Sequence, residues 1–297
     1  MEFLAGVFAM DVLGFSVMSN QLRVILRNRP DVVKTWSDEE VARRWWNLFP
    51  SRRNKDGSPA EPADMDLKSL RADAKVLVEL RARLSRVSWF MRCTSEVIAR
   101  MEYAEEECTG RFWESRFKAT VLSDESAIAA CMVYVDLNPV RAGLAATPER
   151  SDFTSAQERI ADLKSADEVS TPDAKDVRIE HGQKAGWLAP VELEPRRKKV
   201  REKSPSRRAS NRGCVFMSLS EYLQLLDWTG RQLKPGKRGT VPKHAPPILE
   251  RLNLSAELWL QVVGQFGKRR SANRVTPASR FNAAAMPSAP ASTSRQA

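Results

Sequence analysis

Length, composition and charge limit the classes of protein to which this chain can belong. Its 297 residues, of which 42% are hydrophobic, are enough to build one large domain or two smaller ones. The formal net charge is +11, but residues 1–194 hold 27 Lys and Arg against 32 Asp and Glu, whereas residues 195–243 hold 14 against 3. The basic C-terminal third favours a polyanionic partner. Only two histidines, and four cysteines without CxxC spacing, argue against a zinc site.

The first residues predict a short helix and then a strand. Residues 3–10 have helical character, and an extended run follows from Phe15 to Arg27. Within that run, Leu22, Val24 and Leu26 alternate with Gln21, Arg23 and Ile25. This period of two predicts a strand with one face in a core and the other open for chemistry. We do not expect the apolar N-terminus to be a signal peptide, because Glu2 stands where a basic residue is expected and Asp11 interrupts the apolar run.

Five further elements are predicted between residues 37 and 138. Ser37 begins a helix that ends near Leu48. Apolar residues every three or four positions predict one long amphipathic helix over 67–84, and another helix follows Ser85. Residues 111–121 form a second extended stretch, rich in aromatic side chains. Ser123 then caps a helix that ends near Asn138, because Pro139 cannot continue it.

The C-terminal half predicts a linker, a small helical module and a tail. Periodicity fades over 161–214, where prolines, serines and charged residues dominate, so we expect a flexible basic linker. Residues 215–266 form a helical module: Ser218 and Glu221 make a capping box, Gly230 stops that helix, and 255–266 form the last one. Residues 267–297 are expected to be a disordered basic tail. We expect reduced thiols, with Cys93 and Cys131 packed in cores, in a cytoplasmic protein without a membrane partner.

Three segments, in this order and spacing, carry a resemblance to a known family. They read GFSVMSNQLRVILRNRPD (14–31), GRFWESRFKA (110–119) and YVDLNPVRAGLA (134–145). Together they resemble the REP-associated tyrosine transposases, which are single-tyrosine HUH transposases. The segment SEYLQLLDWTGRQ (220–232) looks like a C-terminal extension found in one bacterial branch of the family.

The resemblance implies a fold, a reaction and a cofactor. The fold is α+β, a ferredoxin-like antiparallel sheet with helices, and occupies residues 1–160 here. In the family, two histidines at positions i and i+2 of a strand hold Mg²⁺ or Mn²⁺. A tyrosine then attacks the DNA phosphate and leaves a covalent phosphotyrosine. Tyr134 falls on that nucleophile, and Asn138 on a further metal-coordinating position.

This chain departs from the family at the two histidine positions. Gln21 and Arg23 stand there, and a guanidinium cannot coordinate a cation and repels it. We therefore expect no bound metal. The family's first strand and helix also have no counterpart, so the sheet is expected to lack its first strand.

Single-stranded or hairpin DNA is the expected partner. The side chains expected to contact its phosphates are Arg23, Arg116, Lys118, Arg141, Arg196, Arg197, Lys198, Lys199, Arg207 and Arg208. The pairs Trp45–Trp46 and Phe112–Trp113 either stack on unpaired bases or pack in a core, and core packing is the favoured interpretation.

Three functional hypotheses follow from these residues. The first is a transposase-like protein that binds DNA ends and has lost the ancestral cleavage and rejoining. The second is a nuclease-dead DNA-binding regulator. The third is a transposase remnant without a stable fold, which a cooperative unfolding transition would contradict.

Overall fold

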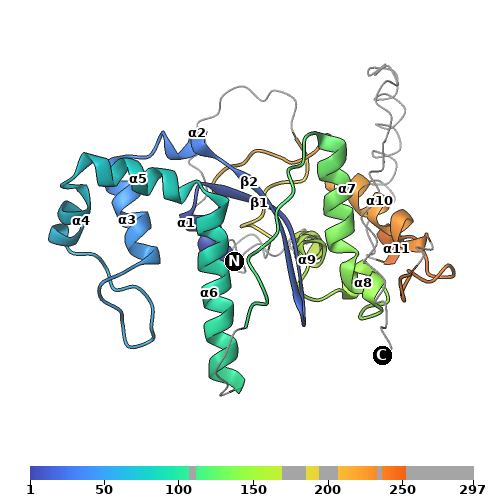
Figure 1. Cartoon of the computed structure of the whole chain (residues 1–297). Coiled ribbons are helices and arrows are strands. Elements are labelled where there is room, and N and C mark those ends of the chain that lie inside the picture. Colours follow the sequence, from blue (N-terminus) through green and yellow to red (C-terminus); the bar gives the residue numbers. More distant parts are fainter. Residues whose placement is uncertain (107–111, 169–184, 194–206, 233–235, 252–297) are drawn as a thin grey trace, which may run out of the picture. The chain divides into compact units, whose positions relative to one another are not determined.

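The described part of the chain combines helices with two antiparallel strands, so its α+β character is confirmed (Figure 1). The computed structural model describes residues 1–106, 112–168, 185–193, 207–232 and 236–251. All of these belong to one compact unit, Met1–Leu254. The predicted helix over 255–266 and the predicted tail lie outside the described residues. No helix among those described is long and apolar enough to cross a membrane.

A hairpin replaces the single strand predicted over 15–27. Strand β1 (Met10–Met18) pairs antiparallel with β2 (Gln21–Asn28), and the register places Ser16 opposite Arg23 and Met18 opposite Gln21. Ser19 and Asn20 form the connection, and both residue types favour tight turns, so the prediction of an unbroken strand was wrong. A register shift between Val12 and Gly14 marks a β-bulge.

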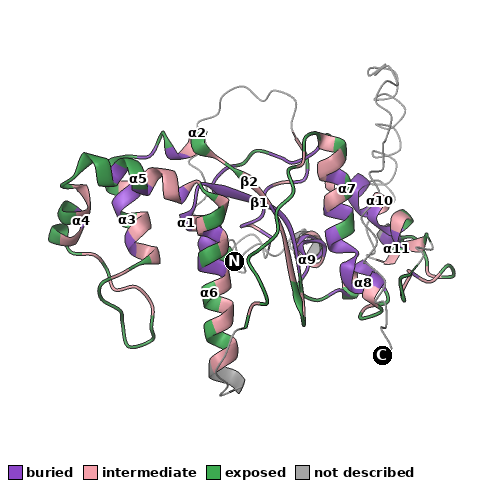
Figure 2. Cartoon of the chain, viewed as in Figure 1, coloured by how far each residue is buried: buried purple, intermediate pink, exposed green. Residues whose placement is uncertain are grey.

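Each face of the hairpin packs against a different hydrophobic core (Figure 2). Phe15 and Val24 face the core that includes α1 (Glu2–Val7) and α2 (Pro30–Val33). Ile25 faces the other core. Because side chains alternate along a strand, this arrangement directs Arg23 and Gln21 toward the same side as Ile25.

One of the predicted helices that surround α1 and α2 is divided into two. Helix α3 (Asp38–Leu48) begins where expected, and the Ser37 hydroxyl accepts a 3.1 Å hydrogen bond from the Glu40 amide. The predicted long helix over 67–84 is divided into α4 (Asp64–Arg71) and α5 (Ala74–Leu84). Asp73 causes the break, since its carboxylate caps α5 by accepting from the Lys75 amide at 2.7 Å. The helix predicted after Ser85 is confirmed as α6 (Val87–Glu106).

The stretch that was predicted to be a second extended segment forms no strand among its described residues, 112–121. Instead, the Trp113 indole donates a 2.9 Å hydrogen bond to the Ser95 carbonyl of α6. Helix α7 (Glu125–Asp136) follows, with Asp124 rather than Ser123 as its cap. Pro139 lies in the first turn of a separate short helix, α8 (Asn138–Ala142), where a proline is tolerated.

The described parts of the predicted linker, 161–168, 185–193 and 207–214, are structured. Helix α9 (Ser155–Glu168) follows a 3₁₀ turn (Pro148–Arg150) and covers the first of them. Trp187 and Leu188 are buried, and the Ala189 amide donates to the Val12 carbonyl of β1 at 2.8 Å. The prediction of a flexible linker is wrong for these residues, because apolar side chains spaced without periodicity still reach the core.

The C-terminal helices share a core with α7. Helix α10 (Leu219–Arg231) carries the predicted capping box of Ser218 and Glu221, and α11 (Ile248–Arg251) lies beyond it. Tyr222 and Leu226 of α10 are fully buried in the core that holds Met132. Residues 215–232 and 236–251 are therefore not packed as a separate module. Gly230 does not stop the helix but lies within it.

Candidate functional site

The fold brings Arg23 and Tyr134 together. The guanidinium carbon of Arg23, on β2, lies 5.1 Å from the centroid of the Tyr134 ring, on α7. The ring is 43% exposed, so one side of this pair faces solvent. Two residues that the sequence analysis placed in one site, from segments more than 100 positions apart, are thus in contact.

Local packing explains why β2 and α7 approach so closely. Ile25, two residues along the strand from Arg23, is buried in the core that includes Met132 and Val133 of α7. Gly14 lies opposite Ile25 in the hairpin, and a Cβ there would meet the Ser155 hydroxyl at 3.2 Å and the Met132 side chain at 3.9 Å. A larger residue at 14 would therefore push α7 and α9 away from the strand.

Two buried side chains, one on β1 and one on α8, have polar atoms without a hydrogen-bond partner among the described residues. Ser16 is fully buried directly opposite Arg23, and its hydroxyl has no hydrogen-bond partner among the described residues. Asn138 is 7% exposed, and its amide nitrogen also lacks a partner in that part of the chain. The sequence predicts that Asn138 lies at the end of the helix that holds Tyr134. Instead, Leu137 separates α7 from α8, and Asn138 is the first residue of α8. Unsatisfied buried donors are costly, and they commonly mark ligand sites.

Arg23 has an unneutralised charge within the described structure. No carboxylate of the described residues pairs with its guanidinium, and one terminal nitrogen, Nη1, is buried without a hydrogen-bond partner. The Tyr134 ring offers only its π face, which attracts a cation weakly. An anion beside this guanidinium would neutralise its charge.

The residues present do not fit the divalent metal of the tyrosine transposases. A permanently charged guanidinium lies against the phenol, where a cation would be repelled. Gln21 and Asn138 offer only neutral amide oxygens, which are weak ligands. Among the described residues there is no group of three or more His, Cys, Asp and Glu side chains that could hold an ion.

Known proteins were compared with the whole chain at the level of families, sequences and structures. The chain matches no family model, no curated protein and no solved structure. The chemistry of the site therefore has to be argued from its own residues.

A buried carboxylate fixes the end of α7 close to the site. Asp136 accepts hydrogen bonds from the Ser155 hydroxyl at 2.5 Å, from the Ala156 amide at 3.0 Å and from the Tyr222 hydroxyl at 2.5 Å. Complete burial raises the pKa of Asp136, against the lowering effect of the nearby Arg159 and of these donors. The aspartate of the YVDLNP segment thus joins α7, α9 and α10, a role that the sequence analysis did not assign.

Three of the arginines predicted to contact DNA are engaged within the protein. Arg141 is buried and donates to the carbonyls of Thr229 and Gln232 at 2.6 and 2.7 Å, which caps the C-terminal end of α10. Arg207 pairs with Glu2. Arg208 donates to the carbonyl of Leu188 at 3.1 Å. We assign these three side chains structural roles.

Apart from Arg23, six of the predicted DNA contacts remain, and the structure describes two of them. Arg116 and Lys118 are exposed in the loop before α7. Arg196, Arg197, Lys198 and Lys199 lie outside the described residues.

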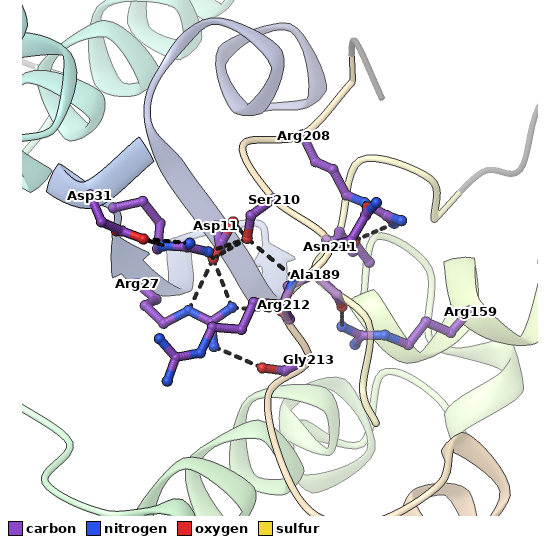
Figure 3. A network of polar contacts seen from close by, with 12 residues as sticks. Asp11, Arg27, Asp31, Arg159, Ala189, Arg208, Ser210, Asn211, Arg212 and Gly213 are labelled. Atoms are coloured by element: carbon purple, nitrogen blue, oxygen red, sulfur yellow. Dashed lines mark hydrogen bonds and ion pairs between the residues drawn. The ribbon is translucent and has the colours of Figure 1, made fainter. Parts of the chain in front are cut away.

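A second polar network, centred on Asp11, was missed by the sequence analysis (Figure 3). The fully buried Asp11 carboxylate accepts from Arg27 at 2.7 Å, from Arg29 at 3.1 Å and from the Ser210 hydroxyl at 2.9 Å. Arg27 also donates to the Gly213 carbonyl at 2.8 Å. The network fastens residues 210–213 to the hairpin. Its only sequence signal is the acidic residue inside an apolar run.

Proposed function

We propose that this protein binds single-stranded or hairpin DNA ends through Arg23 and Tyr134, without a metal ion and without cleaving the DNA. The observation that carries the proposal is the position of the Arg23 guanidinium, which lies against the Tyr134 ring with no carboxylate partner in the described chain. A phosphate is the anion that this position suits best, given the resemblance to DNA transposases.

The chemistry of the two side chains supports a nucleotide as ligand. A guanidinium matches a phosphate by donating two parallel hydrogen bonds. The Tyr134 ring, 43% exposed, has apolar surface for a base or a sugar. Phosphate contacts of this kind give affinity without sequence specificity.

The presence of Gln21 and Arg23 at the two histidine positions accounts for the proposed loss of the ancestral reaction. In the tyrosine transposases the metal polarises the phosphate that the tyrosine attacks. Here Arg23 can bind the phosphate in place of the metal, but Gln21 and Asn138 do not provide a metal site. We propose descent from a ferredoxin-like transposase domain and a present role as a cytoplasmic DNA-binding regulator.

Binding can be tested with a fluorescent hairpin oligonucleotide that carries a single-stranded end, titrated with protein in EDTA at low salt. We expect the same affinity in EDTA and in a separate titration with Mn²⁺ in place of EDTA. Arg23→Gln should bind roughly tenfold more weakly, because a hydrogen-bonded charge is lost. Lys75→Gln is the matched control, since Lys75 is exposed at the start of α5. Equal affinity of the two variants, or no binding by the native protein, would overturn the proposal.

Cleavage can be tested separately with the same hairpin and Mn²⁺. We expect no covalent protein–DNA adduct. An adduct that disappears in Tyr134→Phe would show that the nucleophile is still active and that the inactive-enzyme part of the proposal is wrong.

A further inference from the structure

A cluster of three aromatic side chains lies at the end of α3 and the start of α6. Trp45 belongs to α3, Phe49 follows its last residue, and Trp89 belongs to α6. Ring centroids are 4.7 Å apart for Trp45 and Phe49, 5.4 Å for Trp45 and Trp89, and 6.0 Å for Phe49 and Trp89. We call these three residues the aromatic cluster.

Arginines surround the aromatic cluster. The guanidinium of Arg83, from α5, lies 5.5 Å from the Trp45 ring and 4.7 Å from the Trp89 ring. Arg92, one turn beyond Trp89 on α6, lies 4.9 Å from the same Trp89 ring. Arg83 pairs with Glu79, but Arg92 has no carboxylate partner within the described chain. One of the two guanidinium groups beside the rings, that of Arg92, is therefore without a neutralising carboxylate among the described residues.

Trp46, which follows Trp45 in α3, is packed in the core. Trp46 is 4% exposed, and its indole nitrogen donates to the Ala60 carbonyl at 2.7 Å. Phe49, by contrast, is 37% exposed, and Trp45 and Trp89 are only partly buried at the edge of the core. The favoured interpretation of the Trp45–Trp46 pair as core packing is thus correct for Trp46 and incomplete for Trp45.

We infer that the aromatic cluster, with Arg83 and Arg92, is a stacking surface for the unpaired bases of single-stranded DNA. Exposed aromatic rings stack on bases of any sequence, and guanidinium planes on the same rings extend the stack and attract phosphates. The positive charge favours a nucleic acid over an apolar peptide. The inference rests on the proposed function for the identity of the ligand, but it concerns different residues, on α3, α5 and α6.

The contact can be located by photocrosslinking. A hairpin with 5-iododeoxyuridine in its single-stranded end is bound to the native full-length protein, irradiated and digested. We expect crosslinked peptides that contain Trp45, Phe49 or Trp89. Crosslinks confined to peptides from β2 and α7 would overturn the inference while leaving the proposed function intact.

Affinity measurements provide the second test. Phe49→Leu keeps an apolar side chain at a partly exposed position, and Arg92→Gln removes one exposed charge, so both variants avoid the core. We expect each to weaken single-strand binding by roughly five- to tenfold and duplex binding much less. Arg100→Gln is the control, because Arg100 lies on the same helix and pairs with Glu96 at 2.8 Å.

The two proposals fail separately in this design. Normal affinity of Phe49→Leu and Arg92→Gln, together with weakened Arg23→Gln, would reject the aromatic cluster as a DNA contact. Equal weakening of single-strand and duplex binding would reject stacking in favour of simple charge attraction.

Discussion

Asp11 shows how a single residue can hold a segment in place. It is fully buried and pairs with both Arg27 and Arg29. In Asp11→Asn the two guanidinium groups lose their shared carboxylate, and we expect the free energy of unfolding to fall by about 3 kcal/mol. Urea denaturation measures this change. Asp31→Asn is the control, since Asp31 is largely exposed and should cost under about 1 kcal/mol.

The residues of the candidate site could be predicted, but the residues that support it could not. The resemblance noted in the sequence predicts that Tyr134 and Arg23 share a site, and the Arg23 guanidinium carbon lies 5.1 Å from the Tyr134 ring centroid. The partners of Asp11 and Asp136 lie in the chain up to 199 positions away, as for Ser210. No local pattern encodes such pairs, because they depend on the tertiary fold.

At the scale of the elements, Gly230 of α10 has a different role from the predicted one. Gly230 lies inside the helix, and a Cβ there would come within 2.8 Å of Val241 and 3.2 Å of Leu137. Gly230→Ala should therefore destabilise the protein by about 1–3 kcal/mol, although alanine favours helices. Thr229→Ala, one residue earlier, is the control. A stabilised Gly230→Ala in thermal unfolding would show that the contact is loose.

The boundaries of the elements were predictable only where a local signal marks them. The capping residues Ser37 and Ser218 were identified correctly, because the cap bonds within three residues. The break at Asp73 was missed, since the apolar spacing of three or four residues continues across it. The turn at Ser19 and Asn20 was missed although the polar run there interrupts the alternation. Sequence periodicity reports which side chains are buried and not where the backbone turns.

At the scale of the whole molecule, the Glu158 carboxylate of α9 makes the free energy of unfolding depend on pH. It lies close to the N-terminus and to residues 185–193. Glu158 accepts a 2.8 Å hydrogen bond from the Trp187 indole, and burial raises its pKa from 4.5 to about 7. The Glu158 carboxyl thus stays protonated to a higher pH in the folded state than in the unfolded state. The stabilisation is complete below pH 4.5 and is lost as pH rises through about 7.

Glu158→Gln isolates that contribution. We expect the native protein to lose on the order of 1 kcal/mol of unfolding free energy between pH 5 and pH 8, because solvent screens the half-exposed group. The variant should lose measurably less over the same range. Identical pH profiles in urea denaturation would show that the Glu158 proton does not contribute.

Two hydrophobic cores on opposite faces of one hairpin account for the fold without a larger sheet in the described residues. We expect a cooperative thermal unfolding transition for the full chain, in contrast to the hypothesis of a remnant without a stable fold. Calorimetry of the purified protein measures it. A gradual loss of structure without a transition would support the remnant.

The central claim is that Arg23 has taken the place of the metal beside Tyr134. Anomalous diffraction from a crystal of the protein with hairpin DNA and Mn²⁺ tests it most directly. We predict a DNA phosphate within hydrogen-bonding distance of the Arg23 guanidinium and no manganese peak beside the phenol. A manganese ion held between β2 and the Tyr134 hydroxyl would contradict the account.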